Sequence, residues 1–402
     1  MKTTTTLSLL LTALLPCVSC LSSREKPMEE VIREALADAE AKSLRMAAKY
    51  ADAEGVLPRS FAHGEMQTSD SRWWCSGFFP GLLWYLYEND PKPELLSYAR
   101  LYTGRVEAEQ YNTGTHDLGF MLLCSFGNGY RLTSDTLYRR VLLTGAASLL
   151  KRFHPAVGLI RSWDNTNGGL WDYAVIIDNM MNLELLFRAW RESGEEHFRD
   201  LAVAHADKTL EEHFREDFSS WHVVSYDTLS GEAQRKQTHQ GFSDASAWAR
   251  GQAWGLYGYT MAYRETGHER YLTQALGIAR FLLSHPNMPA DYIPYWDFNA
   301  PDIPHALRDA SSAAIMCSAL IELSGYVEGE LRETFRRVAE TQLRRLASPD
   351  YTARQGENGD FILMHSVGHL PGNSEVDVPL TYADYYFVES LTRYKYLMLD
   401  TM

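Results

Sequence analysis

The chain has 402 residues, and its 38 Lys and Arg residues are outnumbered by 52 Asp and Glu residues, giving a formal net charge of −14. Hydrophobic residues make up 45% of the chain and charged residues 22%, a globular composition that excludes a largely disordered protein. The acidic balance argues against a nucleic-acid binder, which needs a basic surface. It also argues against an anionic substrate, unless positive charge is concentrated locally at a binding site.

The first twenty residues have the order of a targeting signal rather than of folded structure. A short charged start precedes the apolar run 7–15, which is too short to cross a membrane. The small residue Ser19 before Cys20 predicts a bacterial lipoprotein signal over residues 1–19, with Cys20 as the lipidated first residue. Plain export after Ser19 is the alternative. We therefore expect an exported protein, either periplasmic or held at the membrane only through this lipid.

Three further cysteines, Cys75, Cys124 and Cys317, lie far apart in apolar or aromatic surroundings. Because none of these three residues lies in a Cys-x-x-Cys pair, zinc ribbons and dithiol redox motifs are excluded for them, and we expect buried free thiols. Stability must then come from burial of a large core, for which the chain is long enough.

Apolar residues recur with helical periodicity along nearly the whole chain after residue 27. Short turns that contain Gly or Pro join the helices into pairs, which makes the chain a degenerate repeat of helical hairpins. These turns are expected at 88–91, 127–129, 192–194, 265–267 and 324–325. The twelve predicted helices cover residues 28–51, 78–88, 93–110, 117–130, 134–153, 177–192, 196–214, 246–265, 268–284, 311–325, 330–347 and 382–398.

The longer connections lie between the hairpins, at 52–77, 154–176, 215–245, 285–310 and 349–381. Twelve helices with alternating short and long connections predict an all-α (α/α)6 barrel, with an inner and an outer ring in one domain, residues 20–402. An open helical solenoid is the alternative, but it requires no such alternation. Short strands are expected in the long connections, for example at 221–226, with Ser230 and Gly231 in the following turn.

If the even-numbered helices form the inner ring, their N-termini meet at one rim, and the long connections lead to that rim. Loops on a rigid scaffold are where function concentrates, so we expect the active cleft there. Charged and aromatic residues begin these helices, in the segments 73–80, 115–120, 176–182, 239–254 and 309–312.

Asp117 and Asp178 are lone carboxylates in two of these segments. Aspartate is a favoured helix N-cap, so simple capping is the alternative for each residue. Asp178 follows Ile176 and Ile177, where partial desolvation would raise the pKa of its carboxyl group and suit a general acid. Two carboxylates across a cleft are the usual equipment for cleaving a glycosidic bond.

The sequence gives little support to other kinds of site. His116, His222 and His239 lack a zinc-binding spacing. Residues 164–169 resemble a calcium loop but lack its closing Glu, so we interpret them as a turn. The chain has no nucleophile elbow, phosphate loop or dinucleotide fingerprint.

Four motifs resemble the signature blocks of the unsaturated glucuronyl hydrolases, glycoside hydrolase family 88. They are His116-Asp117-Leu118-Gly119-Phe120, Ile177-Asp178-Asn179-Met180-Met181-Asn182, His239-Gln240-Gly241 and Trp248-Ala249-Arg250-Gly251-Gln252-Ala253-Trp254. The resemblance spans residues 28–398 with the blocks in matching order, and the Trp-x-Arg-Gly-Gln-x-Trp stretch is specific.

This resemblance implies an (α/α)6 barrel that needs no metal or organic cofactor. It also implies release of the 4,5-unsaturated uronic acid from the non-reducing end of oligosaccharides left by polysaccharide lyases. Glycosaminoglycan-type disaccharides are the expected substrates. The family's sulfate-reading residues lie near the C-terminal loop, where residues 365–374 of this chain carry no Lys-bearing sulfate motif.

By the same resemblance, Asp178 matches the general acid and base, and Asp117 matches the second carboxylate of the site. Tyr382 or Tyr385 is expected to contribute from the last inner helix, and the sequence does not choose between them. Arg250 and the converging helix N-termini would receive a substrate carboxylate locally. The sugar-binding positions of the family are matched by Trp74, His116, His222, Gln240, Trp248, Arg250 and Trp254.

The implied substrate is a vinyl ether, so the chemistry differs from ordinary displacement at a glycosidic bond. Asp178 would protonate carbon 4, water would add at carbon 5, and the resulting hemiketal would open and expel the neighbouring sugar. Asp117 would bind sugar hydroxyls and stabilise developing positive charge, while Trp faces stack on the sugar rings.

Two alternative functions are open, one in a related enzyme family and one in a different class of protein. The related unsaturated rhamnogalacturonyl hydrolases share the barrel and the vinyl-ether chemistry but act on pectin fragments. A non-catalytic glycan-binding lipoprotein would also be helical, exported and rich in Trp, but it would not require Asp178.

Overall fold

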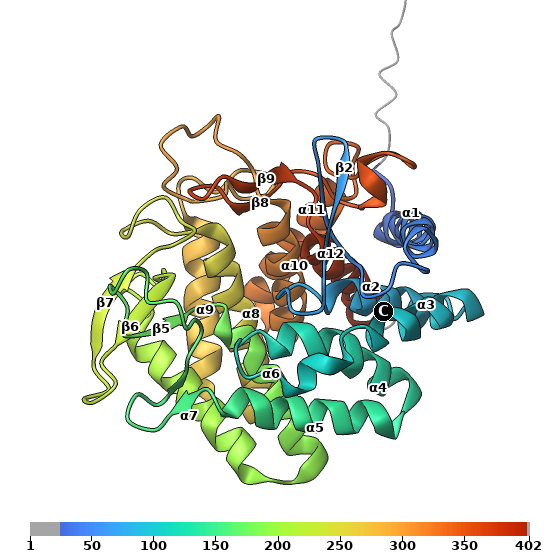
Figure 1. Cartoon of the computed structure of the whole chain (residues 1–402). Helices are drawn as coiled ribbons and strands as arrows, with labels where there is room; N and C mark the ends of the chain where they lie inside the picture. The colour runs from blue at the N-terminus through green and yellow to red at the C-terminus, as the bar shows by residue number, and fades with distance from the viewer. Residues whose placement is uncertain (1–24, 400–402) are drawn as a thin grey trace, which may run out of the picture.

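The computed structural model describes residues 25–399 as a mainly helical molecule (Figure 1). The predicted signal at 1–19 and the lipidated Cys20 lie outside the described residues. The first helix, α1 (Met28–Lys49), packs against both α2 (Phe78–Asn89) and α12 (Thr381–Tyr394), so the beginning and the end of the described chain lie together.

Six helical segments form a closed inner ring, because each contacts the next and α12 contacts α2. The closed ring confirms the predicted (α/α)6 barrel and excludes the open solenoid. The inner segments are α2, η2 (Gly119–Gly127) continuing into α4 (Asn128–Thr133), α6 (Asn179–Ser193), α8 (Ala249–Thr266), α10 (Ala310–Ser324) and α12. The outer helices are α1, α3 (Pro93–Gly104), α5 (Thr136–Leu150), α7 (Glu196–Glu212), α9 (Glu269–Ser284) and α11 (Gly329–Leu346).

Composition explains which helix lies in which ring. All residues of α10 are buried, because its small and apolar side chains pack against both ring neighbours and an outer helix. The outer helix α11 instead buries a single stripe that includes Phe335, Val338 and Leu346, and it presents charged side chains on its other face. A helix that is apolar on all sides therefore lies inside, and an amphipathic helix lies outside.

The long connections contain the strands, as predicted. The strand expected at 221–226 is β6 (Val223–Tyr226), which pairs with β7 (Ala233–Gln237) across a turn that holds Ser230 and Gly231. β6 also pairs antiparallel with β5 (Tyr173–Ile176). The remaining pairs are β1 (Leu57–Ala62) with β2 (Glu65–Ser69), β3 (Phe153–His154) with β4 (Leu159–Ile160), and β8 (Ser366–His369) with β9 (Ser374–Val378). Short helical turns occur at η1 (Glu107–Tyr111), η3 (Asn358–Asp360) and η4 (Lys395–Leu399).

The prediction of a turn at residues 127–129 is wrong. The π-helix η2 continues directly into α4, and the helix ends only at Ser134, whose φ of 55° is left-handed. Gly129 serves close packing rather than chain reversal, since a Cβ on it would lie 2.6 Å from the ring of Tyr138 and 3.0 Å from that of Trp84. A glycine in the sequence therefore does not show by itself whether a helix ends there or packs closely against a neighbouring side chain.

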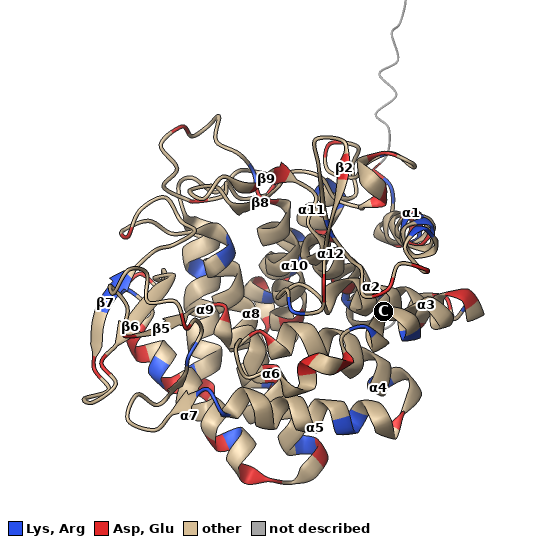
Figure 2. Ribbon diagram, viewed as in Figure 1, with Lys and Arg blue, Asp and Glu red and all other residues tan. Residues whose placement is uncertain are grey.

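Charged residues lie mostly on the outer helices and loops, with acidic and basic positions interspersed on the side shown in Figure 2. Cys75, Cys124 and Cys317 are buried free thiols, as predicted. Between residues 25 and 399, none of the helices combines the length and the apolar character needed to cross a bilayer.

Candidate active site

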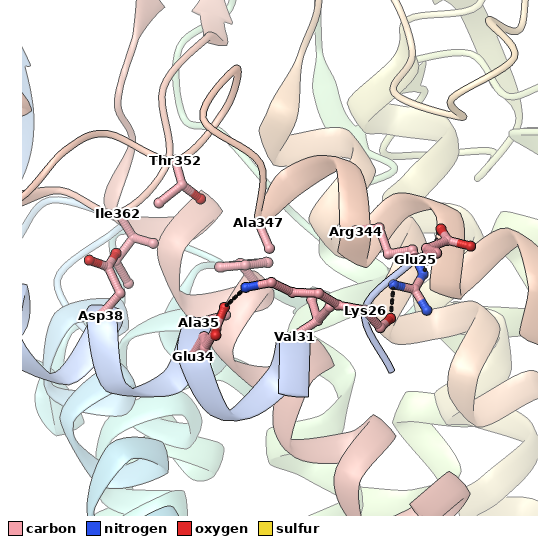
Figure 3. A pocket seen from close by; sticks show the side chains of 11 residues that line it. Glu25, Lys26, Val31, Glu34, Ala35, Asp38, Arg344, Ala347, Thr352 and Ile362 are labelled. Atoms are coloured by element: carbon pink, nitrogen blue, oxygen red, sulfur yellow. Dashed lines mark hydrogen bonds and ion pairs between the residues drawn. The ribbon is translucent and has the colours of Figure 1, made fainter. Parts of the chain in front are cut away.

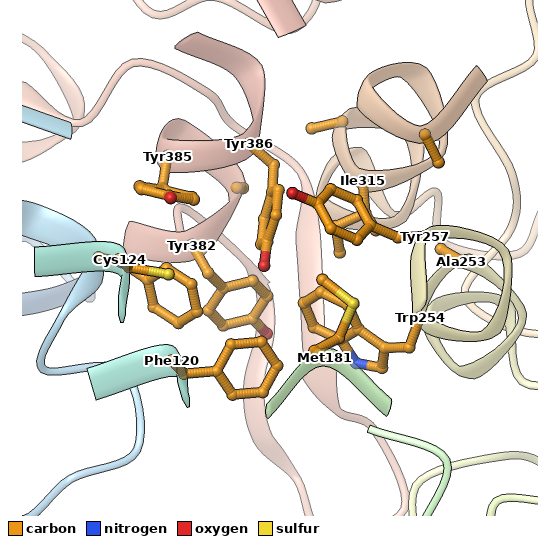
Figure 4. Close-up of a cluster of buried hydrophobic side chains, with 14 of the residues drawn as sticks. Phe120, Cys124, Met181, Ala253, Trp254, Tyr257, Ile315, Tyr382, Tyr385 and Tyr386 are labelled. Carbon is orange, nitrogen blue, oxygen red and sulfur yellow. The ribbon is translucent and has the colours of Figure 1, made fainter. Parts of the chain in front are cut away.

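Aromatic side chains from several inner segments meet inside the ring (Figure 4). The ring of Phe120 from η2 lies 5.2 Å from that of Trp254 on α8, measured between centroids. Trp74, which precedes α2, lies 5.5 Å from Phe120 and 4.9 Å from Tyr382 on α12. These rings form an aromatic platform in which Trp74 is partly exposed and can stack on a sugar ring, while Phe120, Trp254 and Tyr382 are buried behind it.

Asp178 is placed by the strand that leads into α6. β5 ends at Ile176, and the amide of Ile177 donates a hydrogen bond to the carbonyl of His222 over 3.1 Å, which fixes the chain just before the helix begins. Asp178 occupies the N-cap position, yet its side chain caps nothing. It is buried, and its Oδ2 atom has no hydrogen-bond partner. Simple helix capping is therefore excluded as its role.

The surroundings of Asp178 favour its neutral, protonated form. Burial raises the pKa of its carboxyl group to about 7, and the nearby charge of Asp117 acts in the same direction. The guanidinium of Arg250 acts in the opposite direction but does not outweigh the burial. A carboxyl group with a pKa near neutrality can donate a proton and take one back at physiological pH.

His222 faces Asp178 in one defined tautomer. Its Nδ1 accepts hydrogen bonds from the backbone amides of His239 and Gln240, each over 3.1 Å, so its proton resides on Nε2. Nε2 lies 3.8 Å from Oδ2 of Asp178. Burial and the neighbouring cationic groups hold the pKa of His222 well below its usual value, so the ring is a neutral donor. The ring of Trp248 packs against it at a centroid distance of 4.4 Å.

Asp117 occupies a more polar environment than Asp178. Its Oδ2 accepts a hydrogen bond of 2.8 Å from the hydroxyl of Thr115, and its Oδ1 lies 3.3 Å from Nε2 of His116. His116 is buried, and burial lowers the pKa of its imidazole. The two carboxylates thus differ: Asp117 has polar partners, whereas Asp178 is desolvated.

Arg250 connects the site to the β8–β9 hairpin. Its Nη1 and Nη2 donate to the carbonyls of Val367 and Gly368, and its Nη1 lies 3.3 Å from Oδ2 of Asp309. Gln240 donates to the same carbonyl of Gly368 over 3.0 Å. Three contacts of the guanidinium are therefore to protein groups, and fewer of its donors are left for a substrate carboxylate than the sequence implied.

Tyr382, rather than Tyr385, lies at the site. The ring of Tyr382 contacts Trp74 and the guanidinium of Arg250, and its buried hydroxyl has no partner. The hydroxyl of Tyr385 accepts a hydrogen bond from Asn128, and Tyr385 lines a cavity of about 180 Å³ that Tyr257 also borders. The choice that the sequence left open is thus decided by position.

Buried polar atoms without partners gather at this rim. They are Oδ2 of Asp178, Nε2 of His222, Nε1 of Trp254 and the hydroxyl of Tyr382. Because buried polar groups in proteins are nearly always hydrogen-bonded, such a cluster indicates the position of a polar ligand. All nine predicted site residues lie in or beside this cluster.

Two other features delimit the site. A pocket of about 420 Å³ between α1 and α11, lined by residues that include Lys26, Glu34 and Arg344, shares no residue with the candidate site (Figure 3). Within the part of the chain that the structure describes, no three His, Cys, Asp or Glu residues are grouped so as to hold a metal ion.

Sequence reasoning missed two residues of the site. The ring of Trp163 lies 5.8 Å from that of His222 and 5.3 Å from that of His239, measured between centroids. It therefore adds a second Trp ring to the contact between His222 and Trp248. Asp309 was noticed only as the start of a helix. No local pattern in the sequence indicated its contact with Arg250.

A helical barrel with an aromatic platform and two unlike carboxylates at one rim defines a glycosidase. The model of Glycosyl Hydrolase Family 88 matches residues 51–287. An unsaturated glucuronyl hydrolase from Formosa agariphila is 47% identical over 330 residues, which cover 82% of each chain. The chain therefore belongs to glycoside hydrolase family 88.

Solved structures give the same result. An unsaturated glucuronyl hydrolase specific for heparin superposes with a TM-score of 0.89 at 46% identity, covering 93% of this chain and 99% of that chain. The enzyme from Bacillus sp. GL1, described as responsible for the degradation of glycosaminoglycan, superposes with a TM-score of 0.84 at 28% identity, covering 91% and 97%.

Proposed function

We propose that the protein hydrolyses unsaturated glucuronyl disaccharides of the glycosaminoglycan type, releasing the 4,5-unsaturated uronic acid from the non-reducing end. The observation that carries this proposal is the desolvated carboxyl group of Asp178, which has a pKa of about 7. This group lies beside the neutral donor His222 and the second carboxylate, Asp117. Membership of family 88 and the names of the relatives support the same reaction.

The proposed reaction begins with proton transfer to carbon. Protonated Asp178 donates its proton to carbon 4, and the electron pair of the double bond forms the new C–H bond. The positive charge that develops is shared between carbon 5 and the ring oxygen. The carboxylate of Asp117 lies close enough to stabilise this charge electrostatically.

Water then adds at carbon 5, and the Asp178 carboxylate takes the proton that the water releases. The resulting hemiketal opens to a ketone as its ring oxygen leaves carbon 5. Carbon 1 is left as a hemiacetal, which expels the neighbouring sugar as an alcohol and becomes an aldehyde. One water is consumed, and Asp178 returns to its protonated state.

The test is a comparison of four substrates. The protein is incubated with the unsaturated products of lyases acting on chondroitin, hyaluronan, heparin and pectin, and the ultraviolet absorbance of the conjugated alkene is followed. We expect absorbance to fall with one or more glycosaminoglycan products, and the Asp178→Asn variant serves as the inactive control. Turnover of the pectin product alone would instead support the rhamnogalacturonyl alternative. Binding without turnover of any product would support a glycan-binding protein.

We also propose that the chain is exported, that residues 1–19 are removed, and that Cys20 is lipidated at the start of a catalytic domain comprising 20–402. The order of the N-terminal sequence supports this proposal. Partition into detergent and incorporation of a labelled fatty acid are expected for the parent chain and for Cys17→Ala, but not for Cys20→Ala. Fatty acid in the Cys20→Ala variant, or cytoplasmic parent protein, would contradict the proposal.

A further inference from the structure

Asp309 is a fully buried carboxylate that makes more contacts than helix capping requires. It begins α10, where its Oδ1 accepts from the amide of Ser311 over 3.1 Å and from the Ser311 hydroxyl over 2.6 Å. Its Oδ2 accepts from the hydroxyl of Ser312 over 2.6 Å. Two further contacts leave the helix, because Oδ1 accepts from the amide of Val367 on β8 and Oδ2 pairs with Arg250.

These last two contacts lie at the candidate active site. Arg250 and Asp309 form an ion pair whose side chains are 1% and 0% exposed, so water screens neither charge. The guanidinium lies over the ring of Trp248 at 4.5 Å and over that of Tyr382 at 5.5 Å. Arg250 on α8 also donates to the carbonyls of Val367 and Gly368 on β8. Asp309 therefore contacts both partners of this interaction, the guanidinium of Arg250 and the backbone of β8.

We propose that Asp309 is a positioning residue for the reaction: it fixes the Arg250 guanidinium and strand β8 at the rim, and it offsets the positive charge that Arg250 directs at Asp178. This inference rests on the proposed function, because it assigns to Asp178 the role of proton donor. Asp309 does not face the reacting atoms, and it acts through Arg250.

Charged and titratable groups from several elements surround Arg250 and Asp178, and they include His369 on β8, whose pKa burial and the charge of Arg250 lower. Asp178 is surrounded by Asp117, which opposes its ionisation, and by Arg250, which favours it, while His222 is neutral. Arg250 in turn faces the negative charges of Asp309, Asp178 and Glu375 from β9, together with the Tyr382 hydroxyl on α12. Removing the charge of Asp309 leaves Arg250 less compensated, so the Asp178 carboxylate becomes more stable and gives up its proton at lower pH.

The chain offers a matched control. Asp135 caps α5 in the same manner, by accepting from the amide of Leu137 over 2.9 Å, but it lies on the outer ring. Asp309→Asn and Asp135→Asn each replace a capping carboxylate by its amide. We expect the high-pH limb of kcat/KM to move down by about one pH unit in Asp309→Asn, with kcat at pH 7 lowered about fivefold. We expect no movement of the limb in Asp135→Asn.

A second readout does not depend on turnover. Infrared difference titration follows the protonated carboxyl band of Asp178, identified by its absence in Asp178→Asn. The midpoint is expected to move down in Asp309→Asn and up in Arg250→Gln, which also tests the coupling if Asp309→Asn fails to fold. In the Arg250→Gln background, adding Asp309→Asn should no longer lower the midpoint.

The outcomes separate the two proposals. Absence of turnover in the parent protein would reject the proposed function, while the infrared midpoints would still test the coupling of Asp309 to Asp178. An active parent whose pH limb and midpoint respond equally to Asp309→Asn and Asp135→Asn would overturn the positioning role. An unchanged midpoint in Arg250→Gln would overturn it as well.

Discussion

The N-termini of α6 and α10 both begin with a buried aspartate, and the two carboxyl groups are treated in opposite ways. Asp309 accepts hydrogen bonds from its own helix and from β8 and pairs with Arg250. Asp178 caps nothing, its Oδ2 has no partner, and burial raises its pKa to about 7. An aspartate at the start of an inner helix therefore lies at the rim of the barrel in both cases. Its hydrogen-bond partners decide whether it stabilises the structure or is free to transfer a proton.

The largest expected effect separates the two residues by activity. Asp178→Asn keeps the size of the side chain but removes its titratable proton, so we expect kcat to fall by about 100-fold to 10,000-fold. Substrate binding should remain within about threefold, because the aromatic platform is unchanged. Steady-state kinetics and calorimetric binding to an unsaturated disaccharide measure the two quantities. Full residual activity in Asp178→Asn would remove the distinction between the two carboxyl groups.

The next effect concerns stability. Asp309→Ala leaves the buried guanidinium of Arg250 without its counter-charge, and it also removes the cap of α10 and the contact to β8. We expect a loss of about 3–5 kcal/mol in the free energy of unfolding. Asp135→Ala, which removes only a cap, should cost about 1 kcal/mol. Urea denaturation of both variants at pH 7 measures the difference, and equal losses would show that the ion pair contributes nothing.

Asp178→Asn should also stabilise the fold, in a manner that depends on pH. Folding raises the pKa of Asp178 from 3.8 to about 7, so the folded state retains a proton that the unfolded state releases. The parent protein therefore loses stability as pH rises from about 4 to 7, and the variant, which cannot ionise, avoids this loss. We expect a gain of about 2–4 kcal/mol at pH 8 that disappears towards pH 4.

Denaturation curves at pH 5 and pH 8 test this expectation, with Asp135→Asn as the control. A gain in Asp178→Asn that is the same at both values would show that Asp178 is not the group that titrates. A loss at pH 8 would show that the Asp178 carboxylate is stabilised by the fold, as the Asp309 carboxylate is by its partners.

The smallest effect concerns another atom without a partner beside Asp178. Trp254→Phe keeps an aromatic ring against Phe120 but removes the indole N–H. If that N–H binds substrate, its loss should raise KM about fivefold to tenfold with little change in kcat. A matched substitution, Trp84→Phe, removes an indole N–H that is already bonded to Thr103 in the core, and it should leave KM unchanged.

Much of the fold was predictable because the chain is repetitive. Helical periodicity and alternating connection lengths gave the twelve helices and the closed barrel, and β6 lies in the long connection where a short strand was expected. The second inner helix, predicted at 117–130, was placed correctly but ended too early, because Gly127 and Gly129 look like a helix stop. Their actual role, close contact with Leu123, Trp84 and Tyr138, depends on the neighbouring helices and is invisible in local sequence.

The location of the candidate site in the fold was predictable from the sequence, but the hydrogen bonds within it were not. Converging helix starts brought Asp117, Asp178 and Arg250 to one rim, as expected. The tautomer of His222 depends on backbone amides 17 and 18 residues away, and the partner of Arg250 on β8 is 117 residues away. Such long-range hydrogen bonds follow from the packing of loops, which no periodic pattern encodes.

The closed ring has a consequence for how the protein is made. The hydroxyl of Tyr85 on α2 donates to the carboxylate of Glu389 on α12, 304 residues later, so the contact that closes the ring involves the ring helix that is synthesised after the other five. Until α12 emerges, α2 and α10 each leave an apolar side uncovered, which is a state prone to aggregation. A chain that stops before residue 380 also lacks Tyr382, so one helix completes both the inner ring and the aromatic cluster at its rim.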